Sequence, residues 1–191
     1  AQVRIVVDCQ AHLEALSKSS GQKPIPIIVE MDVGQSIGSM RFGVRRSPVQ
    51  NPLGVMALIE QTRTTSGVVF AGVMAYEAQV AGVTDRSQFS PLLNPIKKYL
   101  RWRAVQSVTK KRQQLFDYLL GHGVSCSVSN GGGTGSASFT ALDAAVSEIT
   151  VGSGFLCGHL FDYFHNLGLE PAAFFALEAC RKSERGFLNL Q

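Results

Sequence analysis

The sequence has few charged residues, few cysteines and no long apolar run, and each shortage excludes a class of protein. Charged residues make up 17% of the 191 residues and hydrophobic residues 45%, which is ordinary for a globular chain with one sizeable core. The four cysteines lie far apart and form no CxxC pair, so we expect mostly buried, reduced thiols in a cytoplasmic protein, with no cysteine zinc site or disulfide framework. No apolar run reaches membrane-spanning length, and no signal-peptide pattern opens the chain.

The chain also lacks a nucleic-acid-binding signature, although it is basic. Its net charge is +4 and its pI about 9.0, and many of the basic residues fall in one long predicted helix. In that helix the charges alternate with an apolar stripe, and no aromatic platform accompanies them, so we interpret them as a solvated outer face. These residues are Lys97, Lys98, Arg101, Arg103, Lys110, Lys111 and Arg112.

Apolar segments and helical patterns alternate along the chain, which is typical of a parallel sheet covered by helices. Helices are predicted over residues 11–18, from Asn51 and Pro52, and from Asn94 and Pro95, where Asn and Pro suit a helix start. The expected strands cover residues 3–7, 25–31, 68–73, 124–128 and 148–151, with a further strand at 172–180. The chain begins at Ala1 without a methionine and almost at once on a strand, so we expect a piece of a longer protein.

One glycine-rich segment follows the fourth predicted strand. Residues 127–136 read SVSNGGGTGS, and consecutive glycines allow backbone N–H groups to converge on an anion. Thr134 and Ser136 add hydroxyl groups, and Thr140 with Asp143 resembles a capping box that opens the next helix. Neither a Walker lysine nor the Rossmann glycine spacing is present. The segment therefore predicts a phosphate site, with a simple turn as the alternative.

The position of this segment favours a barrel over a doubly wound sheet. In (β/α)8 barrels the phosphate site follows strands seven and eight, and a whole barrel takes roughly 250 residues. Here the glycine segment follows the fourth predicted strand, and Gly152-Ser153-Gly154 follows the fifth. We therefore predict an α/β fold: about five strand–helix units from the C-terminal part of a (β/α)8 barrel, over residues 1–170. A different barrel enzyme that binds a phosphorylated sugar remains open.

Several short motifs occur in a fixed order at the predicted strand ends. They are EMDVG at 30–34, RFGV at 41–44, FAGVMAYE at 70–77, GGGTG at 131–135 and EITVGS at 148–153. Together they resemble the D-threonine aldolase and D-serine dehydratase group, relatives of the alanine racemase N-terminal domain, from residue 3 to about residue 180. The resemblance implies a fold-type III barrel that binds pyridoxal 5'-phosphate (PLP), followed by a β-rich domain that would begin within residues 171–191.

The resemblance also implies a site and a chemistry. The glycine segment, with Gly152 and Ser153, would hold the PLP phosphate; Arg41 would face the phenolic oxygen; Tyr76 would pack against the ring or touch the substrate. The implied cofactor contacts are Arg41, Tyr76, Gly131, Gly132, Gly133, Thr134, Gly135, Ser136, Gly152 and Ser153. The implied reaction is Cα–Cβ cleavage or β-elimination of a D-amino acid by a cytoplasmic homodimer. An amino acid racemase and a non-catalytic PLP- or phosphate-binding barrel remain as alternatives.

The chain also departs from the family pattern. In the family, the lysine that forms the Schiff base lies at the end of the first barrel strand. We expect no lysine of this chain at a strand end facing the pocket. We therefore assign no catalytic residue and expect the chain alone to be inactive. A divalent metal would be bound in the second domain, and we do not assign His159 or His165 to it. Residues 36–39 form an insertion before Arg41, and Gly154 after Ser153 weakens a dehydratase assignment.

Overall fold

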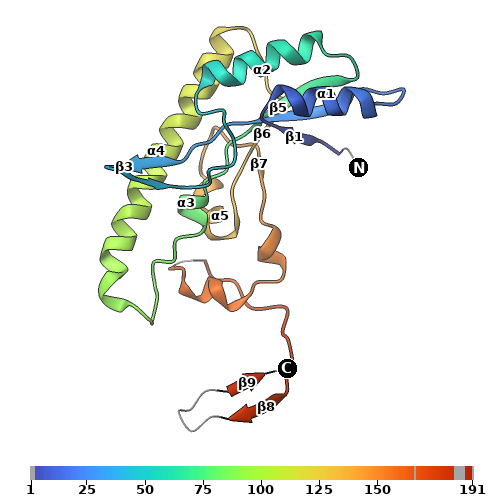
Figure 1. The fold of residues 1–191 in the computed structure, drawn as a ribbon. Coiled ribbons are helices and arrows are strands. Elements are labelled where there is room, and N and C mark those ends of the chain that lie inside the picture. Colours follow the sequence, from blue (N-terminus) through green and yellow to red (C-terminus); the bar gives the residue numbers. More distant parts are fainter. Residues whose placement is uncertain (1–2, 166, 183–187, 191) are drawn as a thin grey trace.

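The computed structural model describes residues 3–165, 167–182 and 188–190, and it confirms the predicted parallel sheet. Five strands lie in the order β1-β2-β5-β6-β7, and every neighbouring pair is parallel (Figure 1). Their bounds are β1 (Ile5–Val7), β2 (Ile25–Glu30), β5 (Val68–Met74), β6 (Val128–Gly131) and β7 (Glu148–Ile149). Parallel strands share one carboxyl edge, so the polar segments that follow them gather on one side of the sheet.

Helices cover the sheet and enclose the core. The longer ones are α1 (Gln10–Ser19), α2 (Pro52–Thr64) and α4 (Asn94–Gly121), and the short ones are α3 (Ala78–Ala81) and α5 (Ala137–Thr140). Alternate residues of β2, among them Ile27 and Val29, join the buried cluster with apolar residues of these helices. The start of α2 is as predicted, because the Asn51 side chain accepts a hydrogen bond from the Gly54 N–H at 2.9 Å.

The sheet is curved. Arg4, directly before the edge strand β1, forms a 3.2 Å ion pair with Glu148 of the opposite edge strand β7. A flat sheet of five strands spaced about 4.8 Å apart would hold these edges too far apart for this contact. The sheet is thus bent as in a barrel wall, and among the described residues its two edge strands, β1 and β7, do not pair with each other to close a barrel.

The insertion before Arg41 forms a hairpin. Strands β3 (Gln35–Ile37) and β4 (Met40–Phe42) pair antiparallel around a two-residue turn. Gly38 in that turn has φ +60°, which suits a tight hairpin connection. Figure 1 shows this hairpin extending from the sheet toward α4.

Three predicted elements were misplaced. The fourth strand of the sheet, β6, begins at Val128, whereas the prediction placed it at residues 124–128. The apolar residues Val124 and Cys126 suggested a strand, but they pack on the core from the connection after α4. No helix opens at Thr140; α5 ends there, since the Thr140 and Asp143 side chains bond to buried charges instead. Residues 171–178 are not a strand: their side chains are largely exposed, and pairing begins only at β8 (Ala179–Lys182), opposite β9 (Leu188–Leu190).

Short 3-10 helices occupy several loops. They are η1 (Pro91–Leu93), η2 (Thr134–Ser136), η3 (Gly152–Phe155) and η4 (His159–Tyr163). The first of the two that follow β6 and β7, η2, forms the end of the glycine-rich segment after β6, and η3 contains Gly152-Ser153-Gly154 after β7. Among the described residues, no helix has both the length and the apolarity needed to cross a membrane.

Two predictions about exposure were wrong in part. The basic residues of α4 do not form one solvated face: Arg112 is 1% exposed, and Arg101 and Lys111 turn toward the body of the chain. Of the four cysteines, Cys157 is buried, Cys9 and Cys126 are partly exposed and Cys180 is exposed.

Candidate functional site

The two glycine-rich segments meet at the carboxyl edge of the sheet. Strands β6 and β7 are neighbours, with Gly131 opposite Ile149, so the loops after them emerge side by side. The hydroxyl oxygens of Thr134 and Ser153 lie 2.8 Å apart and form a hydrogen bond between the loops. Two segments that the sequence singled out separately are therefore one feature in space.

The backbone donors of this feature divide into two groups. The Gly132 N–H donates to Glu77 at 3.0 Å, and the Gly133 N–H donates to the Ser136 hydroxyl at 3.0 Å. Thr134 and Gly135 open a 3-10 helix, and their N–H groups have no hydrogen-bond acceptor within the described part of the chain. Within the described residues, the donors without an acceptor are thus these two N–H groups, the Gly152 and Ser153 N–H groups that open the next 3-10 helix, and one hydroxyl proton of the Thr134–Ser153 pair, because the other is donated between them.

Glu77 is the organising residue of the glycine loop. Its fully buried carboxylate accepts hydrogen bonds from the Gly132 N–H, from the Ser136 hydroxyl at 2.7 Å and from the Thr140 hydroxyl. It also forms an ion pair with Arg112 of α4. Four donors satisfy the hydrogen-bonding capacity of this buried carboxylate, so it holds the loop in place and needs no hydrogen bond from water.

Arg112 connects Glu77 to the rest of the site. Its guanidinium also pairs with Asp143 at 3.0 Å and donates to the Ala75 carbonyl oxygen at 2.8 Å. A Cβ on Gly131 would lie 2.4 Å from the Arg112 side chain, so a glycine is required where the guanidinium passes the loop. The long helix, the end of β5 and the glycine loop are thereby held together through one buried ion network.

Space in the loop also depends on Gly132 and Gly135. Gly132 has φ +90°, which a residue with a side chain rarely adopts. A Cβ on Gly135 would lie 2.1 Å from the Ala81 carbonyl oxygen and 2.6 Å from the Phe164 ring. These glycines therefore let α3 and the segment around Phe164 close on the loop.

Tyr76 lies beside the glycine loop, whereas Arg41 lies in a neighbouring cavity. A Cβ on Gly133 would be 3.0 Å from the Tyr76 ring, so the ring borders the loop closely. The Arg46 guanidinium lies over the same ring at 5.5 Å. Arg46 and Arg41 both line a cavity of about 530 Å³ at the ends of β2 and the hairpin, together with Asp32 and Arg45. Arg46 thus connects this cavity to Tyr76 and the loop.

The cationic groups near this cavity are held by carboxylates. Arg46 pairs with the buried Glu30, and the hydrogen bond to that carboxylate raises the pKa of Arg46. Arg41 pairs with the buried Asp32, whose other oxygen accepts from the Gly34 N–H at 2.6 Å.

Lys111 stands next to the Asp32–Arg41 pair. Its ammonium group donates to the Gly34 carbonyl oxygen, and burial lowers its pKa. Lys111 thus reaches from α4 to the segment after β2, but it is not among the residues that line the neighbouring cavity. The expectation that no lysine at a strand end faces the pocket stays a prediction.

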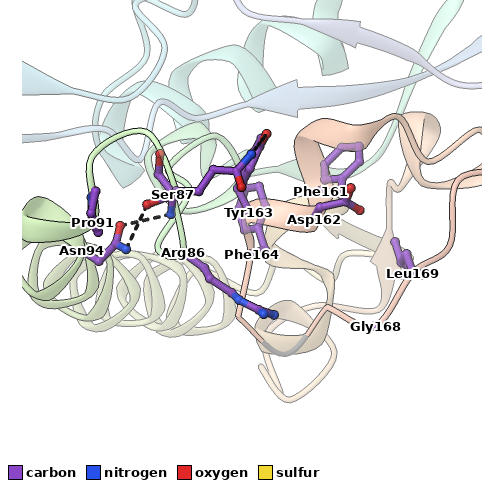
Figure 2. A pocket seen from close by; sticks show the side chains of 11 residues that line it. Arg86, Ser87, Pro91, Asn94, Phe161, Asp162, Tyr163, Phe164, Gly168 and Leu169 are labelled. Carbon is purple, nitrogen blue, oxygen red and sulfur yellow. Dashed lines mark hydrogen bonds between the residues drawn. The ribbon is translucent and has the colours of Figure 1, made fainter.

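A larger cavity, of about 650 Å³, is lined in part by Phe164, the residue that also closes on Gly135 of the glycine loop (Figure 2). Its lining includes Arg86, Ser87, Asn94 and Tyr163, and the Asn94 side chain bonds to the backbone of Ser87 at 3.1 and 3.2 Å. None of the ten predicted cofactor contacts lines it. Cavity size alone would have selected a different part of the molecule.

Sequence reasoning missed the ion network. Arg112 was assigned to a solvated face, yet it stands in line with the buried residues Ala104, Val108, Leu115 and Leu119 of α4. A charged residue at an apolar position of a helical stripe indicates a buried partner, and that signal was available. Glu77 ends the FAGVMAYE motif at 70–77, but its role depends on contacts with distant segments that the sequence does not display.

Comparison with known proteins gives one sequence relative and several similar folds. No protein-family model matches the chain. Over 177 residues the chain is 31% identical to a D-threonine aldolase from an Arthrobacter species, covering 91% of this chain and 40% of that protein. A D-threonine aldolase from Filomicrobium marinum has a similar fold, with a TM-score of 0.71 and 20% identity over 90% of this chain and 42% of that chain.

A third match extends the comparison to racemases. An alanine racemase from Bacillus anthracis has a TM-score of 0.58 at 12% identity, over 89% of this chain and 38% of that chain. The chain thus spans about two fifths of the length of the proteins it matches. The matched sequence and the similar folds support the resemblance seen in the motifs: the chain is similar in sequence to a D-threonine aldolase and has the fold of part of an alanine-racemase-like barrel.

Proposed function

We propose that the glycine loop after β6 and the loop after β7 bind the phosphate of PLP. The observation that carries this is the 2.8 Å hydrogen bond between the Thr134 and Ser153 hydroxyls, which brings the two loops into one donor-rich corner. The unpartnered N–H groups of Thr134 and Gly135 point to an anionic ligand, since buried donors rarely remain unsatisfied.

The residues present fit such a group, with one change from the roles implied by the resemblance. Gly132, Gly133 and Ser136 spend their donors within the loop, so they shape the corner, while Thr134, Gly135, Gly152 and Ser153 are the proposed phosphate contacts. Bound PLP supplies an electron sink for carbanionic chemistry. Tyr76 would border its ring beside the loop, and Arg41, held by Asp32, would supply positive charge from the adjoining cavity.

For the protein that contains this chain, we propose a PLP-dependent lyase that acts on D-configured β-hydroxy amino acids. The 31% identity to a D-threonine aldolase supports aldol cleavage over the other reactions of the fold. Incubation of the complete protein with PLP and D-threonine should release glycine and acetaldehyde. Formation of a 2-oxo acid and ammonia instead would indicate a dehydratase, and interconversion with L-allo-threonine, which differs from D-threonine only at Cα, would indicate a racemase.

We also propose that this chain does not supply the amine that would hold PLP covalently. Lys111, the lysine at the carboxyl edge, is bonded to Gly34 beside Asp32 and Arg41. Borohydride reduction of the chain with PLP, followed by mass spectrometry, should give no stoichiometric lysine adduct. A single adduct on Lys111 would contradict this and make it the candidate amine.

Phosphate binding is tested by comparing PLP with pyridoxal, which lacks the phosphate, in equilibrium dialysis. A hydrogen bond to a charged group contributes about 1.5–3 kcal/mol, so Thr134→Val and Ser153→Ala should each weaken PLP binding by about tenfold or more. Neither variant should alter pyridoxal binding. Ser138→Ala is the matched control, because this serine lies in the same segment with its side chain exposed. Equal affinities of all three variants for PLP would refute the phosphate site.

A further inference from the structure

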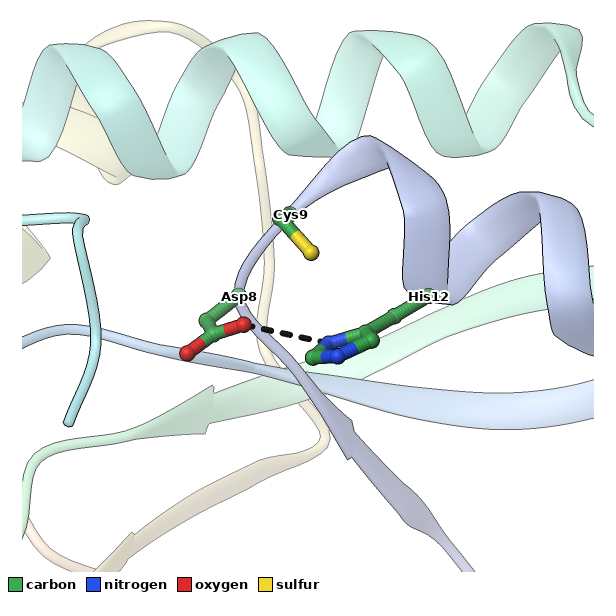
Figure 3. A group of neighbouring side chains, drawn as sticks. All are labelled: Asp8, Cys9 and His12. Carbon is green, nitrogen blue, oxygen red and sulfur yellow. Dashed lines mark ion pairs between the residues drawn. The ribbon is translucent and has the colours of Figure 1, made fainter.

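Asp8, Cys9 and His12 form a cluster at the carboxyl end of β1 (Figure 3). One potential ligand atom from each of the three residues lies within 4.8 Å of the others. The Asp8 carboxylate and His12 Nδ1 are 3.1 Å apart. The cluster shares no residue with the glycine loop or with the cavity that contains Arg41.

The local backbone explains why these side chains converge. Cys9 is extended, with φ −154° and ψ 163°, and it occupies the cap position before α1. Its side chain makes no capping hydrogen bond, so the sulfur is not engaged with the helix start. Side chains in a helix lean toward its N-terminus, and His12 in the first turn of α1 therefore leans back toward Asp8 and Cys9.

The distances suit a small tetrahedral ion. Zinc binds nitrogen and oxygen at about 2.0–2.2 Å and sulfur at about 2.3 Å, which places ligand atoms roughly 3.3–3.6 Å apart. The Asp8 oxygen and His12 Nδ1 are 3.1 Å apart, and all three ligand atoms lie within 4.8 Å of one another. Small side-chain rotations would therefore bring the three atoms to the spacing that zinc requires. The His12 side chain is 54% exposed, which leaves access for a fourth ligand from solvent.

The donor set also selects the kind of metal. A thiolate and an imidazole are ligands for zinc and similar transition metals, whereas magnesium and calcium prefer oxygen alone. The positive end of α1 opposes a cation with roughly half an elementary charge. Two anionic ligands, the carboxylate and the thiolate, outweigh that opposition.

We propose that Asp8, Cys9 and His12 bind one zinc-like transition-metal ion, with a water molecule as fourth ligand. The site is separate from the metal position that the family resemblance assigns to a second domain. Metal binding at this site does not depend on PLP binding, so its test is independent of the proposed lyase function.

Cobalt(II) is the probe, because a bound thiolate gives a sulfur-to-cobalt charge-transfer absorption and tetrahedral cobalt gives intense visible bands. Titration of the full chain should show both, saturating at one cobalt per chain, and zinc should abolish them by displacement. A large excess of magnesium should not. In Cys9→Ser the charge-transfer absorption should disappear. In His12→Ala, cobalt affinity should fall by at least the roughly 10- to 100-fold that loss of an outer-shell partner costs.

Two variants serve as matched controls. Cys126→Ser removes a partly buried cysteine elsewhere, and His159→Ala removes an exposed histidine that pairs with Asp162 at 2.8 Å without a cysteine. Both should bind cobalt like the parent chain, and circular dichroism without metal should match for all variants. Charge-transfer absorption that persists in Cys9→Ser, or that disappears in Cys126→Ser, would overturn the proposal. So would absence of cobalt binding to the parent chain.

Discussion

Replacement of Glu77 by alanine tests whether one buried carboxylate holds the glycine loop. The substitution removes the ion pair with Arg112 and leaves three donors without their acceptor: the Gly132 N–H and the Ser136 and Thr140 hydroxyls. The Arg112 guanidinium keeps Asp143 and the Ala75 carbonyl oxygen as partners. The expected outcome is therefore a large loss of stability without a wholly unpaired buried charge.

The size of the loss follows from these contacts. Breaking a buried ion pair from one side costs about 3–5 kcal/mol, and the retained Asp143 contact places Glu77→Ala toward the lower part of that range. The Ser136 hydroxyl has an alternative acceptor, the Gly133 carbonyl oxygen at 3.2 Å, which limits its contribution. For a domain of 150–250 residues, about 3 kcal/mol corresponds to a fall in Tm of roughly 6–12 °C.

Urea unfolding followed by circular dichroism measures this loss, as a lower midpoint at an unchanged slope. Glu60→Ala is the control, because Glu60 forms an exposed ion pair with Arg63 at 2.7 Å on α2. That deletion should cost about 0.5 kcal/mol or less. Glu77→Gln keeps the side-chain shape and should fall between the two, so a result is obtained even if the alanine variant does not fold. If the Glu77 variants lost no more stability than Glu60→Ala, the role assigned to this network would be wrong.

Two further predictions concern a glycine and a lysine. Gly135→Ala should destabilise the chain and weaken PLP binding, because the new methyl group meets the Ala81 carbonyl oxygen. Gly21→Ala is the control, because a Cβ there meets nothing within 4 Å and the residue lies outside the site, so it should do neither. Equal urea midpoints for the two variants would contradict this. Lys111 should titrate below the ordinary lysine value of 10.5, because burial lowers its pKa. Competitive acetylation of Lys111 at a series of pH values, measured by mass spectrometry, should show this lowered pKa. Reactivity of Lys111 that rises only near pH 10.5 would contradict the prediction. Since the unfolded chain binds more protons between the two pKa values, the native chain should gain stability relative to Lys111→Met as the pH rises through that window.

The local pattern of the sequence was sufficient for the sheet and its carboxyl edge. Apolar runs of the length of β2 and β5, each followed by polar or glycine residues, predicted parallel strands, and Asn51 with Pro52 predicted the start of α2. These features depend on neighbours in the chain, namely side-chain periodicity, cap chemistry and the missing Cβ of glycine. The motifs at the strand ends were sufficient for the family resemblance as well, and the Arthrobacter relative confirmed it.

Contacts between distant segments decided the rest. Arg112 is 31 residues from Asp143 and 35 from Glu77, and the three form one network only because α4 lies against the ends of β5 and β6. For the same reason the solvated helix face was predicted wrongly, and the fourth strand was placed too early. A charge is buried where several segments supply its partners together, and periodicity along one segment does not contain that information. The sequence by itself determined that polar and glycine residues follow the strands; the tertiary structure decided which of their donors bond to one another and which have no acceptor among the described residues.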